Sequence, residues 1–428
     1  MSESKGRGRS RRAVLVGGGA LALAGIGALA LRPAERGNGG HDAYFARLSE
    51  ALRRAGIAHP VLVIDRQRLD ANIRAVRESL AGPGLPLRVV AKSLPSPRLL
   101  ETVMSGMATD RLMLFSAAML RQVQPLHPEA DILLGKPLPV EEFARFADEA
   151  GAEAAARVQW LIDTPERLDA YAQAARARGL PLRANIEIDV GLHRGGFADP
   201  AALTAALGSV LPAGGVTVSG LMGYDPHVPK MPTGAEGAHR RAQAAYAGFI
   251  AALGAAGVAE PSRLTLNTAG SPTFRRHARG TVANEVAVGS AFVKPGDFDQ
   301  DDLDDLQPAA FIATPVLKAT AEMALPGVEF ASGVLHWWDR NSRQGFFIHG
   351  GHWLARPVSP EGLQYSGLYG RSSNQELLTG SANVALGPGD HVFLRPDQSE
   401  AVFLQFGDLL VFDGETIGER WPALPVSA

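Results

Sequence analysis

Between residue 88 and about residue 292, short apolar runs alternate with longer Ala-rich segments whose apolar positions recur at helical spacing. The short runs predict buried strands, and the longer segments, such as 165–178 and 238–256, predict amphipathic helices. We predict eight strands, at residues 88–92, 111–115, 131–135, 157–163, 183–189, 218–224, 263–267 and 285–292. Eight strand–helix units over about 200 residues match the length of a (β/α)8 barrel.

The pattern changes after residue 309, where the long helical spacing stops. Short β-type runs follow, separated by Gly-, Pro- and Asp-bearing turns, at residues 311–317, 345–348, 391–394, 401–406 and 409–412. These runs predict a C-terminal all-β domain, and we expect residues 61–65 to form a strand of that domain. The predicted fold class is therefore α/β, a TIM-type barrel followed by an all-β domain. Its expected segments are 1–31 (export signal or anchor), 32–58 (linker and N-terminal segment), 59–300 (barrel) and 301–428 (β domain).

The N-terminus has the pattern of a targeting segment. Residues 1–12 hold five basic residues against one acidic residue, and an uncharged run occupies residues 13–31. A basic region followed by an apolar region is typical of an export signal, and Ser10-Arg11-Arg12 with Ala13-Val14-Leu15 resembles the twin-arginine motif. We expect an exported protein, periplasmic or extracellular, with residues 32–40 as a flexible linker. Cleavage stays open, because an apolar run of this length also suits an uncleaved membrane anchor.

The amino-acid composition excludes several kinds of site and partner. The 428 residues include no cysteine, which excludes disulfides, a thiolate nucleophile, and cysteine-bound zinc, iron–sulfur clusters or haem. A hydrophobic fraction of 46% is ordinary for a globular protein. The net charge is −2 and the body holds no basic tract, so we expect no nucleic-acid partner.

Candidate chemistry falls where the predicted strands end, which is the active-site face of such a barrel. Lys92 ends the apolar run 87–91, and partial removal from water there favours a nucleophilic amine. A surface lysine is the plainer alternative. The run 267–273 (Asn-Thr-Ala-Gly-Ser-Pro-Thr) and the pair Gly289-Ser290 follow the last two strands, where phosphate sites are common. Each of these alone also fits an ordinary turn, but together with Lys92 they fit pyridoxal 5′-phosphate bound as a Schiff base.

Several runs resemble the fold-type III pyridoxal-phosphate enzymes of the alanine racemase type. They are residues 63–73 and 88–92, and the fifth-strand run 186–196 with His193-Arg194-Gly195-Gly196. The runs 220–224, 270–273 and 389–396 are closer to the D-threonine aldolase and D-serine dehydratase branch. The similarity covers about residues 59 to 422.

This resemblance implies a role for each matching residue. Lys92 would form the Schiff base and serve as the catalytic base. The residues implied to bind the cofactor are Lys92, His193, Arg194, Tyr224, Asn267, Gly270, Ser271, Thr273, Gly289 and Ser290. Of the cofactor residues, Tyr224 would approach the pyridine ring. For His193 and Arg194 a surface loop is the alternative, and Asp225 and His227 are further polar candidates that also suit a turn.

The sequence departs from this branch at its metal ligands. The branch uses a Pro-His-x-Cys or Pro-His-x-Asp motif near the end of the chain, but here the residues are Pro396-Asp397-Gln398-Ser399. Glu376 stands in the second ligand run. Soft zinc ligation is implausible there, so we expect no metal. Asp397 and Glu376 binding a hard cation through oxygen is the alternative.

The resemblance implies a pyridoxal-phosphate enzyme acting on an amino acid, and a lyase for D-3-hydroxy amino acids is the first expectation. Amino-acid racemisation is the alternative, because it needs no metal. A non-catalytic pyridoxal-phosphate-binding protein and a sugar- or peptide-binding barrel without this cofactor also remain. The resemblance further implies a homodimer in which Tyr365 or Tyr369 of the β domain supplies the second acid or base. A membrane tether is expected only through the N-terminal segment.

Overall fold

A computed structural model describes residues 32–324, 326–327 and 329–425 of the chain. The predicted export signal or anchor, residues 1–31, lies outside the described residues. Among the residues described, no helix has both the length and the apolar character needed to cross a membrane. The chain divides into two compact units. The larger unit holds Glu50–Ala313, Trp353–Arg356 and Leu394–Ala428, and the smaller holds the chain up to Ser49, Thr314–His352 and Pro357–Phe393.

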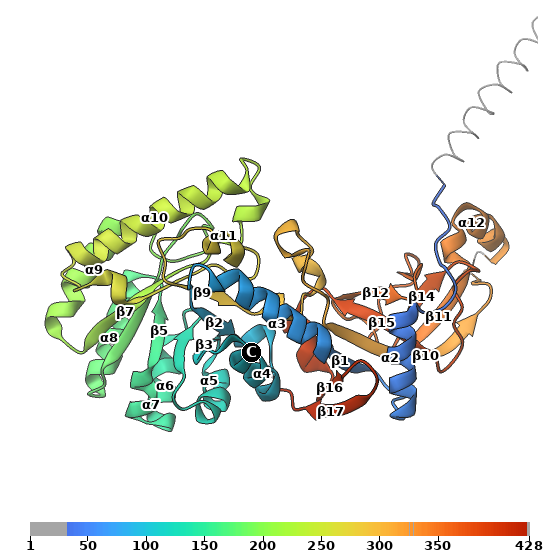
Figure 1. Cartoon of the computed structure of the whole chain (residues 1–428), viewed down its shortest axis with the longest axis horizontal. Coiled ribbons are helices and arrows are strands. Elements are labelled where there is room, and N and C mark those ends of the chain that lie inside the picture. Colours follow the sequence, from blue (N-terminus) through green and yellow to red (C-terminus); the bar gives the residue numbers. More distant parts are fainter. Residues whose placement is uncertain (1–31, 325, 328, 426–428) are drawn as a thin grey trace, which may run out of the picture. The chain divides into compact units, whose positions relative to one another are not determined.

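The larger unit is built on a closed barrel of eight parallel strands (Figure 1). All eight predicted strands are present, which confirms the (β/α)8 prediction. The first and last strands pair to close the barrel, with Val89 opposite Val288. Both end earlier than predicted, so Lys92 and Gly289 lie in the turns that follow them. The strands are β2 (Leu87–Val90), β3 (Arg111–Leu114), β4 (Asp131–Leu134), β5 (Val158–Ile162), β6 (Leu182–Glu187), β7 (Val216–Gly223), β8 (Thr265–Thr268) and β9 (Glu285–Val288).

Helices alternate with the barrel strands, and the sequence contains residues that stabilise helix starts. Thr164 and Asp199 accept a backbone N–H at the starts of α8 and α9, and in each case a proline follows at the first helical position. The apolar faces pack on the strands, as where Phe143 and Tyr171 enclose Trp160 of β5. The helices are α3 (Arg66–Ala81), α4 (Pro97–Met107), α5 (Ala117–Val123), α6 (Val140–Ala150), α7 (Ala152–Arg157), α8 (Pro165–Ala177), α9 (Pro200–Val210), α10 (Ala235–Ala255) and α11 (Phe274–Ala278).

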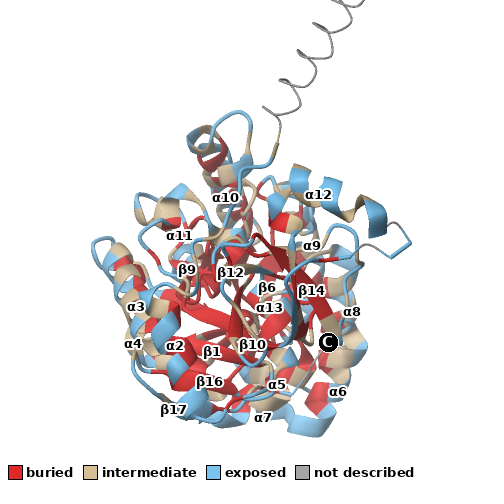
Figure 2. Cartoon of the chain, turned by 90° about the vertical axis from the view of Figure 1, so that its right-hand side faces the viewer, coloured by how far each residue is buried: buried red, intermediate tan, exposed pale blue. Residues whose placement is uncertain are grey.

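The larger unit also contains strands outside the barrel. Strand β1 (Val61–Asp65) pairs antiparallel with the start of β10 (Ala310–Thr320) and parallel with β16 (Leu409–Phe412). Strand β17 (Ile417–Trp421) pairs with β16. Figure 2 shows β1 and β16 in the colour of buried residues, and every residue of both is buried. Residues 61–65 therefore form the predicted strand, which pairs with two predicted strands of the C-terminal region but belongs to the larger unit.

Strand β10 continues into the smaller unit, because the division falls between Ala313 and Thr314. There it pairs antiparallel with β11 (Gln344–His349), which pairs with β14 (Gln375–Gly380). Strand β13 (Gln364–Tyr365) pairs with β14. This mostly antiparallel region confirms the predicted β domain. The unit also holds α12 (Ser332–Trp338) and most of α2 (Ala43–Arg54), and β12 (Ala355–Ser359) and β15 (His391–Pro396) have residues in both units.

Two details differ from the sequence analysis. The predicted strand 401–406 is wrong: α13 (Ser399–Val402) is followed there by the 3-10 turn Phe403–Gln405. Val402 and Phe403 are both buried, and a short run of apolar residues fits a buried helical turn as well as a buried strand. Residues 32–40, expected to be a flexible linker, hydrogen-bond within the smaller unit, where the amide of Arg36 donates to Asn341 Oδ1 at 2.7 Å.

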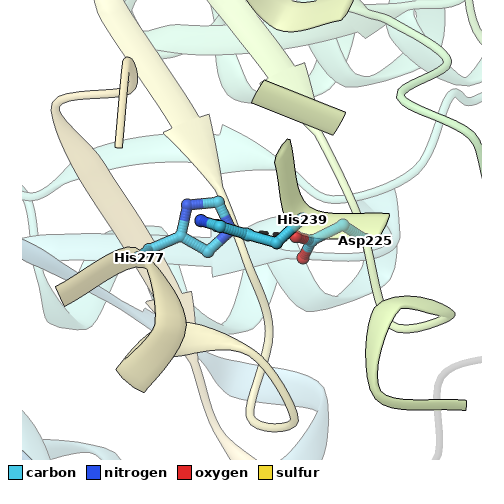
Figure 3. A group of neighbouring side chains, drawn as sticks. All are labelled: Asp225, His239 and His277. Carbon is cyan, nitrogen blue, oxygen red and sulfur yellow. Dashed lines mark hydrogen bonds and ion pairs between the residues drawn. The ribbon is translucent and has the colours of Figure 1, made fainter. Parts of the chain in front are cut away.

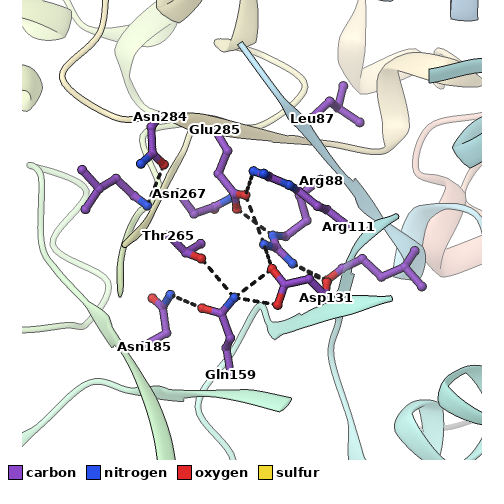
Figure 4. Close-up of polar contacts among 12 residues, drawn as sticks. Leu87, Arg88, Arg111, Asp131, Gln159, Asn185, Thr265, Asn267, Asn284 and Glu285 are labelled. Carbon is purple, nitrogen blue, oxygen red and sulfur yellow. Dashed lines mark hydrogen bonds and ion pairs between the residues drawn. The ribbon is translucent and has the colours of Figure 1, made fainter. Parts of the chain in front are cut away.

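Charged and amide side chains fill one layer of the barrel interior (Figure 4). Arg88 of β2 is fully buried and donates to Glu285 of β9 at 2.6 Å and to Asp131 of β4 at 2.7 Å. Arg111 also donates to Glu285, at 2.8 Å. Gln159 donates to both oxygens of Asp131 at 3.0 Å. The layer is therefore a connected network in which each carboxylate has several donors.

Burial raises the pKa of Asp131, but the charge and hydrogen bonds of Arg88 outweigh burial, and the net pKa is lowered. Removing a buried arginine of this kind lowers the stability of the fold, because its carboxylate partners then stay buried without a compensating charge.

We expect Arg88→Met to lower the free energy of unfolding by about 3–5 kcal/mol, because Glu285 would stay buried without its main cation. Urea denaturation at pH 7 measures this difference. The matched control is Arg98→Met, which breaks an exposed pair with Glu101 and should cost about 0.5 kcal/mol or less. Similar losses in the two variants would contradict the stabilising role of the layer.

Candidate active site

A cavity of about 130 Å³ opens where the barrel strands end, and it is partly open to solvent. Eight of the ten predicted site residues line it: Lys92, Arg194, Tyr224, Asn267, Gly270, Ser271, Gly289 and Ser290. The structure thus brings together residues from the ends of four strands and from the loop after β6. Their chemical roles stay predictions.

Lys92 lies in the 3-10 turn Ala91–Ser93 directly after β2. Its Nζ is 2.9 Å from Oε1 of Glu400 and 5.2 Å from the centre of the Phe115 ring. The side chain is 41% exposed, so the amine is accessible from the cavity. Lys92 is therefore held by a carboxylate on one side and an aromatic face on the other.

Glu400 was not foreseen from the sequence. It belongs to α13 and lines the cavity. Burial raises its pKa, but Lys92 outweighs burial, so the net pKa is lowered and the group is a carboxylate at neutral pH. The available signal was its position directly after Pro396-Asp397-Gln398-Ser399, the run that departs from the resembling branch.

The turns after β8 and β9 form a cradle of small residues and polar groups. The hydroxyl of Ser271 accepts hydrogen bonds from the amides of Gly289 at 3.3 Å and Ala291 at 3.0 Å. A Cβ on Gly270 would lie 2.6 Å from the Tyr224 ring, and one on Gly289 would lie 2.8 Å from the carbonyl oxygen of Val90. Only glycine fits these approaches, and backbone N–H groups with hydroxyls beside them suit a phosphate.

Tyr224 and Arg194 form another wall of the cavity. The guanidinium of Arg194 lies 5.0 Å from the centre of the Tyr224 ring and 3.8 Å from a carboxylate oxygen of Glu187. Burial is the main cause that raises the pKa of Tyr224, so its hydroxyl stays protonated at neutral pH. Asn267 lies deeper and donates to Glu285 at 2.7 Å, which joins the cavity to the charged layer of the barrel.

Two predicted residues do not line the cavity. The His193 side chain is 83% exposed, and its Nδ1 lies 2.7 Å from Asp189. Thr273 is buried, and its hydroxyl donates to Oδ1 of Asp225 at 2.6 Å instead of facing the cavity. Asp225 is itself buried away from the cavity, and His227 is half-buried beside Gly191. The cofactor roles of His193 and Thr273 stay predictions.

The two carboxylates at the branch's metal-ligand positions are each paired with an arginine. In the larger unit, Arg356 donates to Asp397 at 2.6 Å. In the smaller unit, Arg371 forms an ion pair with Glu376, which also accepts the amide of His352 at 2.7 Å. A carboxylate that is already paired with a guanidinium attracts a hard cation less strongly than an unpaired carboxylate does.

Comparison with known proteins gives a family and a fold. Residues 64–295 match the family described as alanine racemase, N-terminal domain. D-threonine aldolase from Filomicrobium marinum is similar in structure, with a TM-score of 0.67 and 19% identity over 86% of this chain and 97% of that one. D-threo-3-hydroxyaspartate dehydratase from Delftia sp. HT23 has a TM-score of 0.66 and 16% identity over 86% and 98%. Alanine racemase from Bacillus anthracis has a TM-score of 0.64 and 15% identity over 85% and 98%. A comparison with curated protein sequences gives no match.

The pairing of Lys92 with Glu400 predicts a pH-dependent stability. The lowered pKa of Glu400 gives a contribution that is present above its unfolded pKa, about 4.3, and is lost as the pH falls through the folded pKa. In ligand-free Lys92→Met this contribution disappears, so we expect the variant to be less stable than the wild type by about 1 kcal/mol or less at pH 7. Urea denaturation at pH 7, 5 and 3.5 should show the difference shrinking as the pH falls. The exposed Lys136→Met is the control, and a pH-independent difference for Lys92→Met would refute the pairing.

Proposed function

The chain belongs to the alanine racemase N-terminal domain family, whose enzymes depend on pyridoxal 5′-phosphate, and from this premise we propose a lyase that cleaves D-3-hydroxy amino acids at the Cα–Cβ bond. The proposed reaction is a retro-aldol cleavage that yields glycine and an aldehyde. The single observation that supports it is the carboxylate of Glu400 at 2.9 Å from the amine of Lys92, inside the cavity.

The residues of the cavity fit the cofactor. Lys92 supplies the amine for its aldehyde, and the cradle of Gly270, Ser271, Gly289 and Ser290 has the donors and the space for its phosphate. When bound, pyridoxal phosphate withdraws electrons from the bonds at the substrate Cα. The protonated hydroxyl of Tyr224 lies on the wall of the same cavity.

Glu400 and Lys92 divide the proton transfers between them. The Glu400 carboxylate accepts the proton of the substrate β-hydroxyl as the Cα–Cβ bond breaks, and that oxygen becomes the carbonyl of the leaving aldehyde. The electron pair stays at Cα, which then takes a proton from Lys92 in its ammonium form, and the proton that Glu400 accepted restores that form. Arg194, exposed at the cavity wall, is placed to bind the substrate carboxylate.

This assignment gives Glu400 the task that a metal performs in the resembling branch. A metal there would polarise the β-hydroxyl, but Asp397 and Glu376 are compensated by Arg356 and Arg371. A carboxylate base beside Lys92 supplies the same deprotonation without a Lewis acid.

The arginine pairs also favour a second candidate, amino-acid racemisation, because this reaction needs no metal. A racemase needs a second proton carrier besides Lys92. By resemblance that carrier would be Tyr365 or Tyr369 of a partner subunit. Tyr365 lies in the smaller unit with the guanidinium of Arg371 3.8 Å from its ring centre.

We also propose that the protein works as a homodimer and outside the cytoplasm. The dimer rests on the family resemblance. Export rests on the basic residues of 1–12 and the uncharged run 13–31.

The first prediction concerns cofactor binding. Purified wild type should show a visible absorbance band from cofactor bound at Lys92, and Lys92→Ala should lose it. Gly289→Ala should retain much less cofactor, because its Cβ would meet Val90 at 2.8 Å. The control Gly254→Ala, where the added Cβ meets nothing within 4 Å, should keep the band. A wild type that shows no band after incubation with pyridoxal phosphate would contradict the proposal.

The second prediction separates the roles of Glu400 and Lys92. We expect Glu400→Gln to slow D-threonine cleavage by about 10²–10⁴-fold while D-alanine, which has no β-hydroxyl, still exchanges its Cα proton with solvent deuterium. Acetaldehyde release and NMR exchange measure the two reactions. Lys92→Ala should lose both. Equal losses of both reactions in Glu400→Gln would rule out its action on the β-hydroxyl, and interconversion of L- and D-alanine by the wild type without cleavage would favour the racemase.

A further inference from the structure

Three buried side chains that the proposed reaction does not use meet beside the cradle loop (Figure 3). They are Asp225 after β7, His239 of α10 and His277 of α11, with exposed fractions of 1%, 9% and 1%. One potential ligand atom from each lies within 4.8 Å of the others. The residues are far apart in the sequence, so only the fold assembles them.

The hydrogen bonds around the two histidines match those of metal ligands. His277 contacts Thr281 Oγ1 through Nδ1 at 3.0 Å, and its Nε2 lies 2.9 Å from Oδ2 of Asp225. His239 contacts the carbonyl oxygen of Gly280 through Nε2 at 3.3 Å. Its Nδ1 is buried and has no hydrogen-bond partner among the described residues. A metal-binding histidine commonly uses one ring nitrogen for the metal while a hydroxyl or carbonyl orients the other.

We propose that Asp225, His239 and His277 bind one divalent zinc ion. Two imidazole nitrogens and one carboxylate oxygen are typical zinc ligands, whereas Mg²⁺ and Ca²⁺ prefer sets made only of oxygen. A modest closing of the three side chains brings their ligand atoms to coordination distance. This position is separate from Asp397 and Glu376, and it does not depend on the proposed lyase activity.

The site would fix the loop that contains the cradle. Asp225 also accepts the hydroxyl of Thr273 at 2.6 Å, and Thr273 directly precedes α11, which contains His277. An ion shared by Asp225 and His277 would therefore hold the start of α11 against the loop after β7. We infer a structural ion, because none of the three residues lines the candidate active-site cavity.

The test uses the full chain purified from zinc-supplemented culture, with metal content measured by mass spectrometry. We expect about one zinc per chain. After dialysis against a chelator, ZnCl2 should raise the melting temperature and MgCl2 should not. The main variant is His239→Gln, because His239 lies at the edge of the cluster and glutamine is similar in size to histidine. It should weaken zinc binding by more than about 100-fold. The loss of a direct ligand costs more than the roughly 10–100-fold that is typical for the loss of a residue that only orients a ligand.

The matched control is His59→Gln, at an exposed histidine outside the cluster, which should bind zinc like the wild type. Wild type that contains no zinc and shows no change in melting temperature with ZnCl2 would overturn the proposal and leave a cluster held by hydrogen bonds alone. Equal zinc binding by wild type and His239→Gln would also overturn it, because the metal would then lie elsewhere. Cofactor absorbance measured in parallel distinguishes this failure from failure of the lyase proposal.

Discussion

The buried pair of Arg88 and Glu285 is the interaction on which the larger unit depends. It joins the first and last strands of the barrel, and it neutralises charges that would otherwise be prohibitive to bury. The same two strands lead directly into the site. Lys92 comes four residues after Arg88, and Gly289 comes four residues after Glu285. Barrel closure therefore sets the distance between Lys92 and the cradle at Gly289. Asn267, which donates to Glu285 from the cavity, extends the same control to the loop after β8.

The fold was largely predictable because its strands are short apolar runs separated by clear helical spacing. All eight barrel strands and residues 61–65 were predicted from that pattern. The helix at Ser399–Val402 was not, because a few apolar residues in a row satisfy either structure until burial is known. Eight of the ten predicted site residues line one cavity because the strand ends of such a barrel meet on one face. Glu400, and the cluster of Asp225, His239 and His277, depend on contacts between distant segments that no local pattern records.

Arginine side chains pair with both carboxylates at the branch's metal-ligand positions, one pair in each unit. The resembling branch places a cation near the end of the chain, and here arginine side chains compensate the carboxylates at the corresponding positions. A guanidinium supplies positive charge but has no vacant coordination position, so it cannot polarise a hydroxyl as a Lewis acid does. The proposed lyase therefore uses a protein base at the β-hydroxyl. The lowered pKa keeps Glu400 a carboxylate at neutral pH beside Lys92, so the group can accept a proton.

The separation of Arg88 and Glu285 along the chain has a consequence for biosynthesis. The two residues are 197 positions apart, so the barrel cannot close until all of its strands have left the ribosome. Closing so long a loop is a slow, non-local folding step. During that interval Arg88 lacks Glu285, and the apolar strands form an open sheet whose edges can pair with other chains. Synthesis of this protein therefore includes a period in which chaperone binding or aggregation competes with barrel closure. This period ends only when the last barrel strand, β9, has been made.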